Sequence, residues 1–300
     1  MKSDLLNTLK LIVKPYGITL YETDPALAFK EAIRSLYEAT GVGVVVLIDE
    51  YDRPILEHIE NSREAEIFRD TLETFYQIIK GSESLLRFVF IAGVTKFAKV
   101  SVFSKLNNLT DISKVAKYAC MFGYTQEELE GNFNEYIKKA LAKGIPDHPE
   151  INSRTLLLEE IKHWYDGFRF VPGEATVYNP VSIGKFFWND QEFANYWFET
   201  GTPTFLMKLL KQKGLTLVDA ARATMSEASL STFDVNELST NDVQDERLIQ
   251  ILFQTGYLTI EKLKRVRPER VYQLRFPNYE VSYSFEKNLL NVYAGDMMLE

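Results

Sequence analysis

The chain has 300 residues, of which 46% are hydrophobic, enough to bury a sizeable core and to form two domains. Its formal net charge of −8 disfavours nucleic-acid or anionic-membrane binding over the whole surface, although a local basic patch is compatible with it. A single cysteine, Cys120, excludes an intrachain disulfide framework, and with three scattered histidines it excludes a Cys/His metal cluster. The N-terminal residues contain no apolar run long enough for a signal or membrane span, so we expect a cytoplasmic protein without membrane contact.

Two amphipathic helices are predicted first, over residues 3–13 and from Asp24 onward. Asp24 and Pro25 form a favourable N-cap and N1 pair, and the second helix is expected to end near Gly41.

A continuous apolar run, Val44–Ile48, predicts a central parallel strand that is buried on both faces. Asp49 and Glu50 follow it directly and Asp52 lies two places further on, where open α/β sheets bind ligands. The run has the form of a Walker B element, with Asp49 as the Mg²⁺ ligand, Glu50 polarising a water for attack on a γ-phosphate, and Asp52 as a further cofactor-binding residue. The alternative is a strand that ends in a polar loop.

A long helix over residues 61–80 and a second apolar strand over residues 87–92 come next. Strand, helix and strand with short connections indicate a βαβ unit, so the two strands are expected to be parallel neighbours.

The segment from Gly93 to Asn108 is polar and follows the second strand directly. In P-loop ATPases the strand beside Walker B ends in a polar residue that senses the γ-phosphate. Thr95 is the first candidate for that catalytic role, with Asn107 and Asn108 as cofactor-binding alternatives. A loop that only caps the sheet edge is the other interpretation.

The Walker A pattern G-x-x-x-x-G-K-[ST] is absent from these residues. The nearest similar stretch, Gly93 to Ser101, has Ala98 in place of the second glycine and Val100 in place of Ser or Thr. The carboxylates after the first strand therefore lack the element that cradles the phosphates.

The remaining chain is predicted to be mostly helical. Thr125 opens a capping box for a helix over residues 125–142, and residues 145–152 form a linker. The predicted domains are therefore residues 1–144 and 153–300. Residues 253–260 and 270–275 are predicted to form a C-terminal β-hairpin.

Five cations surround the turn of this hairpin, as the wing of a winged helix would present them to DNA phosphates. A solvated hairpin tip is the alternative. These candidate nucleic-acid contacts are Lys262, Lys264, Arg265, Arg267 and Arg270.

The order and spacing of eight segments resemble the bacterial AAA-ATPase-like family, often encoded as a fusion with a C-terminal PD-(D/E)XK nuclease-like domain. The segments are VVVLIDEYDRPI, LRFVFIAGVTKFAKVSVFSKLNNLTDIS, FGYTQEELE, WYDGFRF, YNPVSI, YWFETGTPTFL, FQTGYLTI and FPNYEV. The resemblance implies an α/β fold, with a partial P-loop NTPase core of the AAA-like type and then a mostly helical, winged-helix-like region. It also implies ATP and Mg²⁺ as cofactors, matches Asp49 and Glu50 to the Walker B pair, and places Thr95 in the loop after the sensor strand.

Members of this family normally begin with a P-loop segment of the type R-P-R-R-F-G-K-S, and this chain is expected to start after it and to stop before the nuclease-like domain. We therefore expect no ATP hydrolysis and at most weak nucleotide binding by this polypeptide alone. Expected partners are a P-loop-containing fragment or a second copy, because an incomplete sheet leaves apolar surface open. The alternative function is a nucleic-acid-binding or protein-interaction module that uses the winged-helix-like region, with DNA as a partner.

Overall fold

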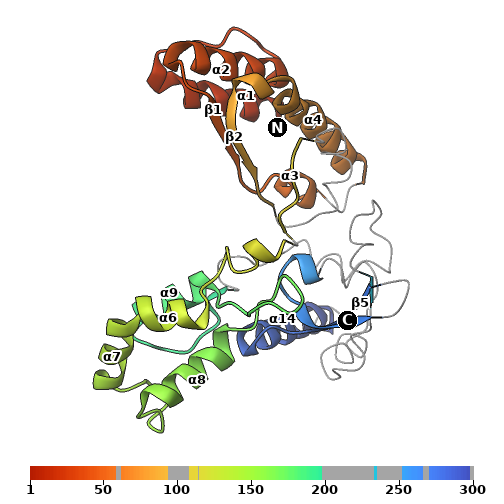
Figure 1. Cartoon of the computed structure of the whole chain (residues 1–300). Helices are drawn as coiled ribbons and strands as arrows, with labels where there is room; N and C mark the ends of the chain where they lie inside the picture. Colours follow the sequence, from red (N-terminus) through yellow and green to blue (C-terminus); the bar gives the residue numbers. More distant parts are fainter. Residues whose placement is uncertain are drawn as a thin grey trace. The chain divides into compact units, whose positions relative to one another are not determined.

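The computed structural model describes residues 1–58, 62–93, 108–113, 115–197, 233–234, 252–265 and 270–297. The chain forms two compact units, Met1–Thr110 with Leu238–Val243, and Asp111–Glu237 with Gln244–Glu300 (Figure 1). No helix among the described residues is long and apolar enough to cross a bilayer.

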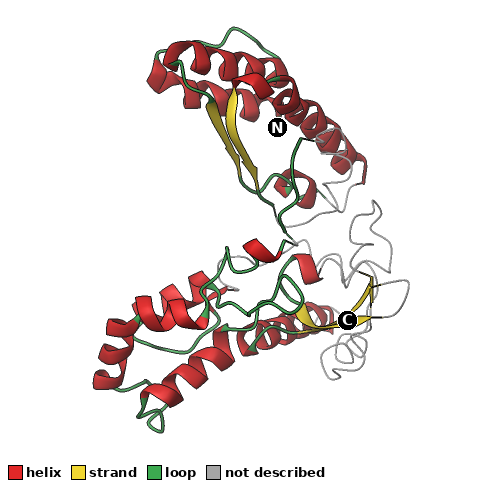
Figure 2. Ribbon diagram, viewed as in Figure 1, coloured by secondary structure: helices red, strands yellow, loops and turns green. Residues whose placement is uncertain are grey.

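The first unit contains helices packed against a small sheet (Figure 2). The Asp24 carboxylate accepts hydrogen bonds from the N–H groups of Ala26 and Leu27, and Gly41 ends the helix in the left-handed region, so the predicted cap and stop are confirmed. The elements are α1 (Lys2–Val13), η1 (Lys14–Tyr16), α2 (Pro25–Thr40), β1 (Val44–Ile48), α3 (Arg53–Leu56), α4 (Ser62–Gly81), η2 (Glu83–Leu85) and β2 (Leu86–Ile91).

The two strands of this unit confirm the predicted βαβ connection. β1 pairs with β2 in parallel, with Val45 opposite Phe88 and Leu47 opposite Phe90. The alternate residue Val46 packs into a core formed by α1, α2 and α4. Because side chains alternate between the faces of a strand, the two pairs share the opposite face of the sheet.

The prediction that β1 is buried on both faces is wrong. Leu47 is 69% exposed, Val45 is 49% exposed, and Phe88 on β2 is 54% exposed. The helices α1, α2 and α4 form their core on one face only, and no described element covers these side chains. The continuous apolar run correctly predicted the strand. It does not show whether a second layer of structure covers the other face of the sheet.

The second unit contains five described α-helices and a three-stranded antiparallel sheet in the order β3-β5-β4 (Figures 1 and 2). The capping box at Thr125 is confirmed, but the helix predicted over residues 125–142 is interrupted at Phe133. The elements are η3 (Ala116–Tyr118), α6 (Gln126–Asn132), α7 (Asn134–Lys143), α8 (Arg154–Tyr165), α9 (Pro180–Trp188), β3 (Phe233–Asp234), β4 (Thr259–Arg265), β5 (Arg270–Arg275) and α14 (Tyr279–Met297).

An aromatic-rich cluster forms part of the core of the second unit, and Tyr165, Tyr178 and Phe186 are among its fully buried side chains. Ile145 and Ile151, from the stretch predicted as a linker, are also buried in this cluster. The core therefore joins helices on both sides of residues 145–152, while the division into domains at 1–144 and 153–300 stays a prediction.

The C-terminal hairpin is present, but its first strand is shifted along the chain. Residues 253–260 were predicted as a strand, whereas β4 begins only at Thr259. A turn precedes it, in which Gly256 has a φ of 84° and the Leu258 N–H donates to the Leu252 carbonyl. The apolar residues just before Thr259 therefore lie in a turn, where they are buried without pairing in a strand.

Candidate functional site

The end of β1 places three carboxylates in two different environments. Asp49 and Glu50 are exposed, whereas Asp52 is 0% exposed. Glu50 has a φ of 50°, and its N–H donates a 2.9 Å hydrogen bond to Asp49 Oδ1. This tight turn directs the first two carboxylates to solvent and the third into the protein.

Arg53, which sequence reasoning missed, fixes the position of Glu50. Its Nη1 lies 2.9 Å from Glu50 Oε2, and its Nε lies 2.8 Å from Glu57 Oε1. The spacings of three and four residues are those of neighbours on a helical turn, a signal that the sequence contained. Both ion pairs are exposed, so they orient side chains more than they stabilise the fold.

The ends of β1 and β2 lie side by side. The Ala92 N–H donates to the Ile48 carbonyl at 2.8 Å, and the Tyr51 N–H donates to the Ala92 carbonyl at 3.1 Å. A methyl carbon placed on Gly93 would lie 2.4 Å from Tyr51 Cε1 and 2.7 Å from Asp52 Oδ1. The backbone at Gly93 therefore occupies a narrow space between an aromatic ring and a buried carboxylate.

Tyr76 of α4 belongs to the same region. Its phenol is buried, and burial raises its pKa well above the usual range, with a further contribution from the negative charge of Asp52. Asp52 thus lies where the ends of both strands meet α4.

The structure describes only some of the polar residues that were predicted to follow β2. Asn108 is exposed, and Thr95 and Asn107 lie outside the described residues. Within the described part of the chain, no three His, Cys, Asp or Glu side chains form a group that could hold a metal ion. Asp49 and Glu50 could therefore hold a cation only together with oxygens from another molecule or segment, as Mg²⁺ sites on nucleotides do.

The predicted basic cluster lies on the β4–β5 hairpin of the second unit. Lys262 is exposed, and Lys264 lies on β4. The register opposes Arg265 to Arg270 at the end of the two strands. Arg267 lies outside the described residues.

The second unit also contains a buried carboxylate that sequence reasoning missed. Glu280, at the start of α14, is 0% exposed and accepts hydrogen bonds from Ser182 Oγ and from the Trp197 N–H, each at 2.8 Å. Burial raises its pKa to about 7, against these hydrogen bonds, which lower it. No local sequence signal marked it, because its partners lie 83 and 98 residues away.

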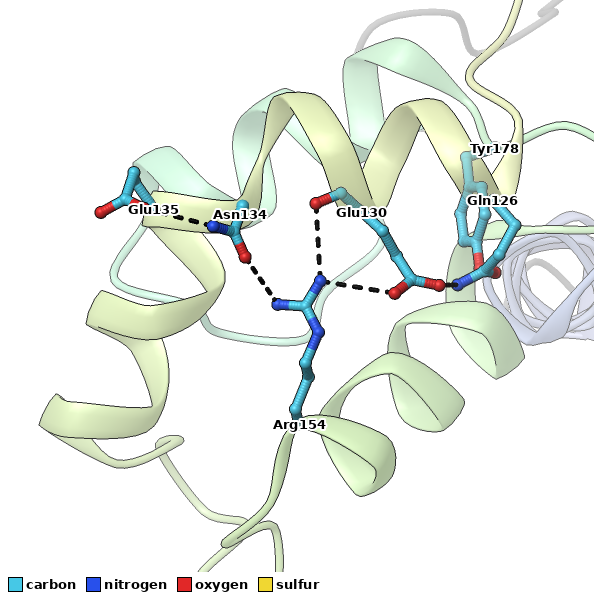
Figure 3. A network of polar contacts seen from close by, with 6 residues as sticks. All are labelled: Gln126, Glu130, Asn134, Glu135, Arg154 and Tyr178. Atoms are coloured by element: carbon cyan, nitrogen blue, oxygen red, sulfur yellow. Dashed lines mark hydrogen bonds and ion pairs between the residues drawn. The ribbon is translucent and has the colours of Figure 1, made fainter.

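A second polar network joins α8 to α6 and α7. Figure 3 shows the Arg154 side chain extending from the start of α8 toward these helices. Its guanidinium donates to Asn134 Oδ1 at 3.0 Å and lies 3.4 Å from Glu130 Oε2, and Gln126 connects Glu130 to the Tyr178 hydroxyl. These contacts bind helices together, and we assign them a structural role.

Comparison with known proteins gives two matches. Residues 1–103 match the family described as Predicted AAA-ATPase. A protein of Azotobacter chroococcum mcd 1, named "Uncharacterized protein in vnfD 5'region", is 38% identical over 280 residues, which cover 93% of this chain and 49% of that protein. The chain therefore spans about half the length of this curated relative.

Proposed function

We propose that this chain, in which residues 1–103 belong to the predicted AAA-ATPase family, carries one half of an ATP site. The observation that carries the proposal is the position of Asp49 and Glu50, which are exposed directly after β1 and beside the end of β2. Parallel α/β sheets bind their ligands at this edge.

In this proposal Asp49 would hold the Mg²⁺ that accompanies a nucleotide, and Glu50 would act as the base that orients the attacking water. The ion pair with Arg53 holds Glu50 at the end of the strand before substrate arrives. A Mg²⁺ held by Asp49 would supply positive charge beside the nucleotide phosphates.

The phosphate cradle must come from another segment, because these 300 residues contain no Walker A pattern. The exposed apolar face formed by Val45, Leu47 and Phe88 is available to pack against the segment that carries this cradle. Catalysis of phosphoryl transfer consists almost entirely of positioning and charge stabilisation, so the chain alone should be inactive.

The test is ATP binding and hydrolysis by the full chain, with Mn²⁺ as a paramagnetic substitute for Mg²⁺. We expect no turnover, and weak Mn²⁺–ATP binding that broadens resonances near residues 49–53. Asp49→Asn should abolish this broadening, whereas Asp70→Asn, which removes an exposed carboxylate on α4, should preserve it. Steady turnover that disappears in Glu50→Gln would contradict the inactive state, and broadening that Asp49→Asn leaves unchanged would contradict the site.

A second candidate function is DNA binding by the β4–β5 hairpin, a role compatible with a winged-helix-like sheet. The strand order β3-β5-β4 and the opposition of Arg265 to Arg270 favour it. Lys262→Glu combined with Arg265→Glu should weaken DNA binding and reduce its salt dependence, whereas Lys138→Glu on α7 should not. Unchanged affinity and salt dependence in the double variant would exclude this hairpin as the contact surface.

A further inference from the structure

We infer that Asp52 is a positioning residue of the proposed nucleotide half-site, and that its buried carboxylate fixes the backbone at Gly93 beside Asp49 and Glu50. The inference rests on the proposed function, since it gives Asp52 a role in that site. It replaces the prediction that Asp52 contacts the cofactor directly.

The Asp52 side chain does not cap the helix that follows it. Asp52 stands at the N-cap position of α3, where an aspartate commonly accepts hydrogen bonds from the first turn. Its side chain makes no such bond, and the residue is 0% exposed. The carboxylate is therefore turned into the protein, although burying a carboxylate is costly unless it is well placed.

The buried carboxylate of Asp52 lies close to the backbone at Gly93. Asp52 Oδ1 and the Tyr51 ring leave room at Gly93 for a hydrogen and not for a methyl group. The neighbouring residues are hydrogen-bonded across the strands, from Tyr51 to Ala92. Asp52 and Tyr51 therefore pack closely against the backbone at the point where the chain leaves β2.

The burial of Asp52 favours a positioning role over direct binding of a metal ion. Mg²⁺ keeps several waters and binds through accessible carboxylates and substrate phosphates. Asp49 and Glu50 are exposed at this edge, whereas Asp52 is enclosed between the strand ends and Tyr76. Asp52 therefore acts on the site through the backbone and not through the metal ion.

The test compares Asp52→Asn with Asp52→Ala in the full chain, with Mn²⁺–ATP affinity as the readout. Asparagine keeps the volume and one acceptor oxygen, so affinity should stay within about threefold, whereas alanine should lower it about tenfold or more. Equal loss in both variants would identify Asp52 as a ligand or a required charge, and equal retention would identify it as a bystander. Either result overturns the inference.

Gly93→Ala gives a second test in which no carboxylate is removed. Its added methyl group should displace Tyr51 and Asp52 and lower Mn²⁺–ATP affinity about as much as Asp52→Ala. Gly81→Ala is the matched control, because a methyl group there meets no atom within 4 Å. Unchanged affinity in a folded Gly93→Ala protein would overturn the inference.

Hydrogen exchange at the Ala92 amide separates this inference from the proposed function. Asp52→Ala should accelerate that exchange about tenfold, while Asp52→Asn and Asp49→Asn should leave it unchanged. If Asp49→Asn does not alter Mn²⁺–ATP affinity, the proposed function fails and the exchange rates still decide whether Asp52 positions the strand end. Exchange at Ala92 that is the same in Asp52→Ala and in wild type would refute the positioning role.

Discussion

Ser182 Oγ donates a 2.8 Å hydrogen bond to Glu280 Oε2, although 98 residues separate them. Both residues are buried, and the second carboxylate oxygen accepts the Trp197 N–H. Glu280 therefore joins α9, α14 and the chain at Trp197 through one carboxylate. Its loss would affect three segments of the second unit together.

The stability of the second unit should depend on the protonation of Glu280. Burial raises the pKa of Glu280 from 4.5 to about 7 in the folded state, so the folded protein binds the proton more tightly than the unfolded chain. This contribution is fully present below about pH 4.5 and is lost as the pH rises through about 7. We expect the free energy of unfolding to fall by roughly 2–3 kcal/mol between about pH 5 and pH 8.

Tryptophan fluorescence measures this change selectively, because all three tryptophans of the chain lie between residues 164 and 197. Among the described residues, Lys185 and Tyr165 are the ionisable side chains that interact electrostatically with Glu280, and the Tyr196 backbone N–H also donates to its carboxylate. Glu280→Gln should flatten the pH dependence, whereas Glu286→Gln, an exposed carboxyl group on the same helix, should retain it. A pH dependence that survives in Glu280→Gln would show that another group causes it.

Features that depend on adjacent residues were predicted from the sequence. Features that depend on residues far apart in the chain were not. The bounds of β1, the cap at Asp24 and the capping box at Thr125 depend on adjacent residues, and the structure confirms them. The burial of Glu280 depends on Ser182, which is 98 residues away, so the residues next to Glu280 in the sequence did not predict it.

The same contrast between adjacent and distant residues applies to the candidate site. The residue types after β1 indicated carboxylate chemistry, but three acidic residues within four positions gave no means of telling which one is buried. The contact of Asp52 with Gly93 requires the pairing of two strands, so only the structure separates Asp52 from the exposed Asp49.

Gly167 should be more sensitive to substitution than another glycine with positive φ. A methyl carbon on Gly167 would lie 1.9 Å from the Pro277 carbonyl oxygen, whereas one on Gly173 meets no atom within 4 Å. Both positions impose backbone strain on alanine, but only Gly167→Ala must also displace the chain before α14. Gly173→Ala should cost about 1 kcal/mol, and Gly167→Ala about 2 kcal/mol more.

Urea unfolding followed by tryptophan fluorescence provides the comparison of these two glycine variants. Equal destabilisation by both substitutions would contradict the prediction. It would mean that the backbone at Pro277 moves away from the added methyl group without a cost in folding free energy.

The Arg154 network should contribute modestly to stability (Figure 3). Arg154→Lys keeps the charge but loses the planar group that reaches Asn134 and Glu130 together, so we expect a loss of about 0.5–1.5 kcal/mol. Lys138→Ala breaks an exposed ion pair with Glu135 and should change stability by less than about 0.5 kcal/mol. Urea unfolding of the two variants checks this order, and a larger effect for Lys138→Ala would contradict it.

The open face of the β1–β2 sheet should make the isolated chain self-associate. Val45, Leu47 and Phe88 form a contiguous apolar surface, because Val45 is paired with Phe88 and Leu47 follows on the same face. Apolar surface of this kind, on two strands that pair only with each other among the described residues, favours association with another chain. Sedimentation velocity over a range of concentrations should therefore show a reversible increase in mass.

Charged substitutions identify the surface responsible. Leu47→Glu with Phe88→Glu should abolish the concentration dependence without unfolding the unit, since both side chains are already exposed. Leu11→Glu, which alters a side chain that is 67% exposed on α1, should leave self-association intact. A wild-type chain that stays monomeric at all concentrations would contradict the prediction. Association that Leu11→Glu abolishes, and the double variant does not, would place the contact on the helices instead of the sheet.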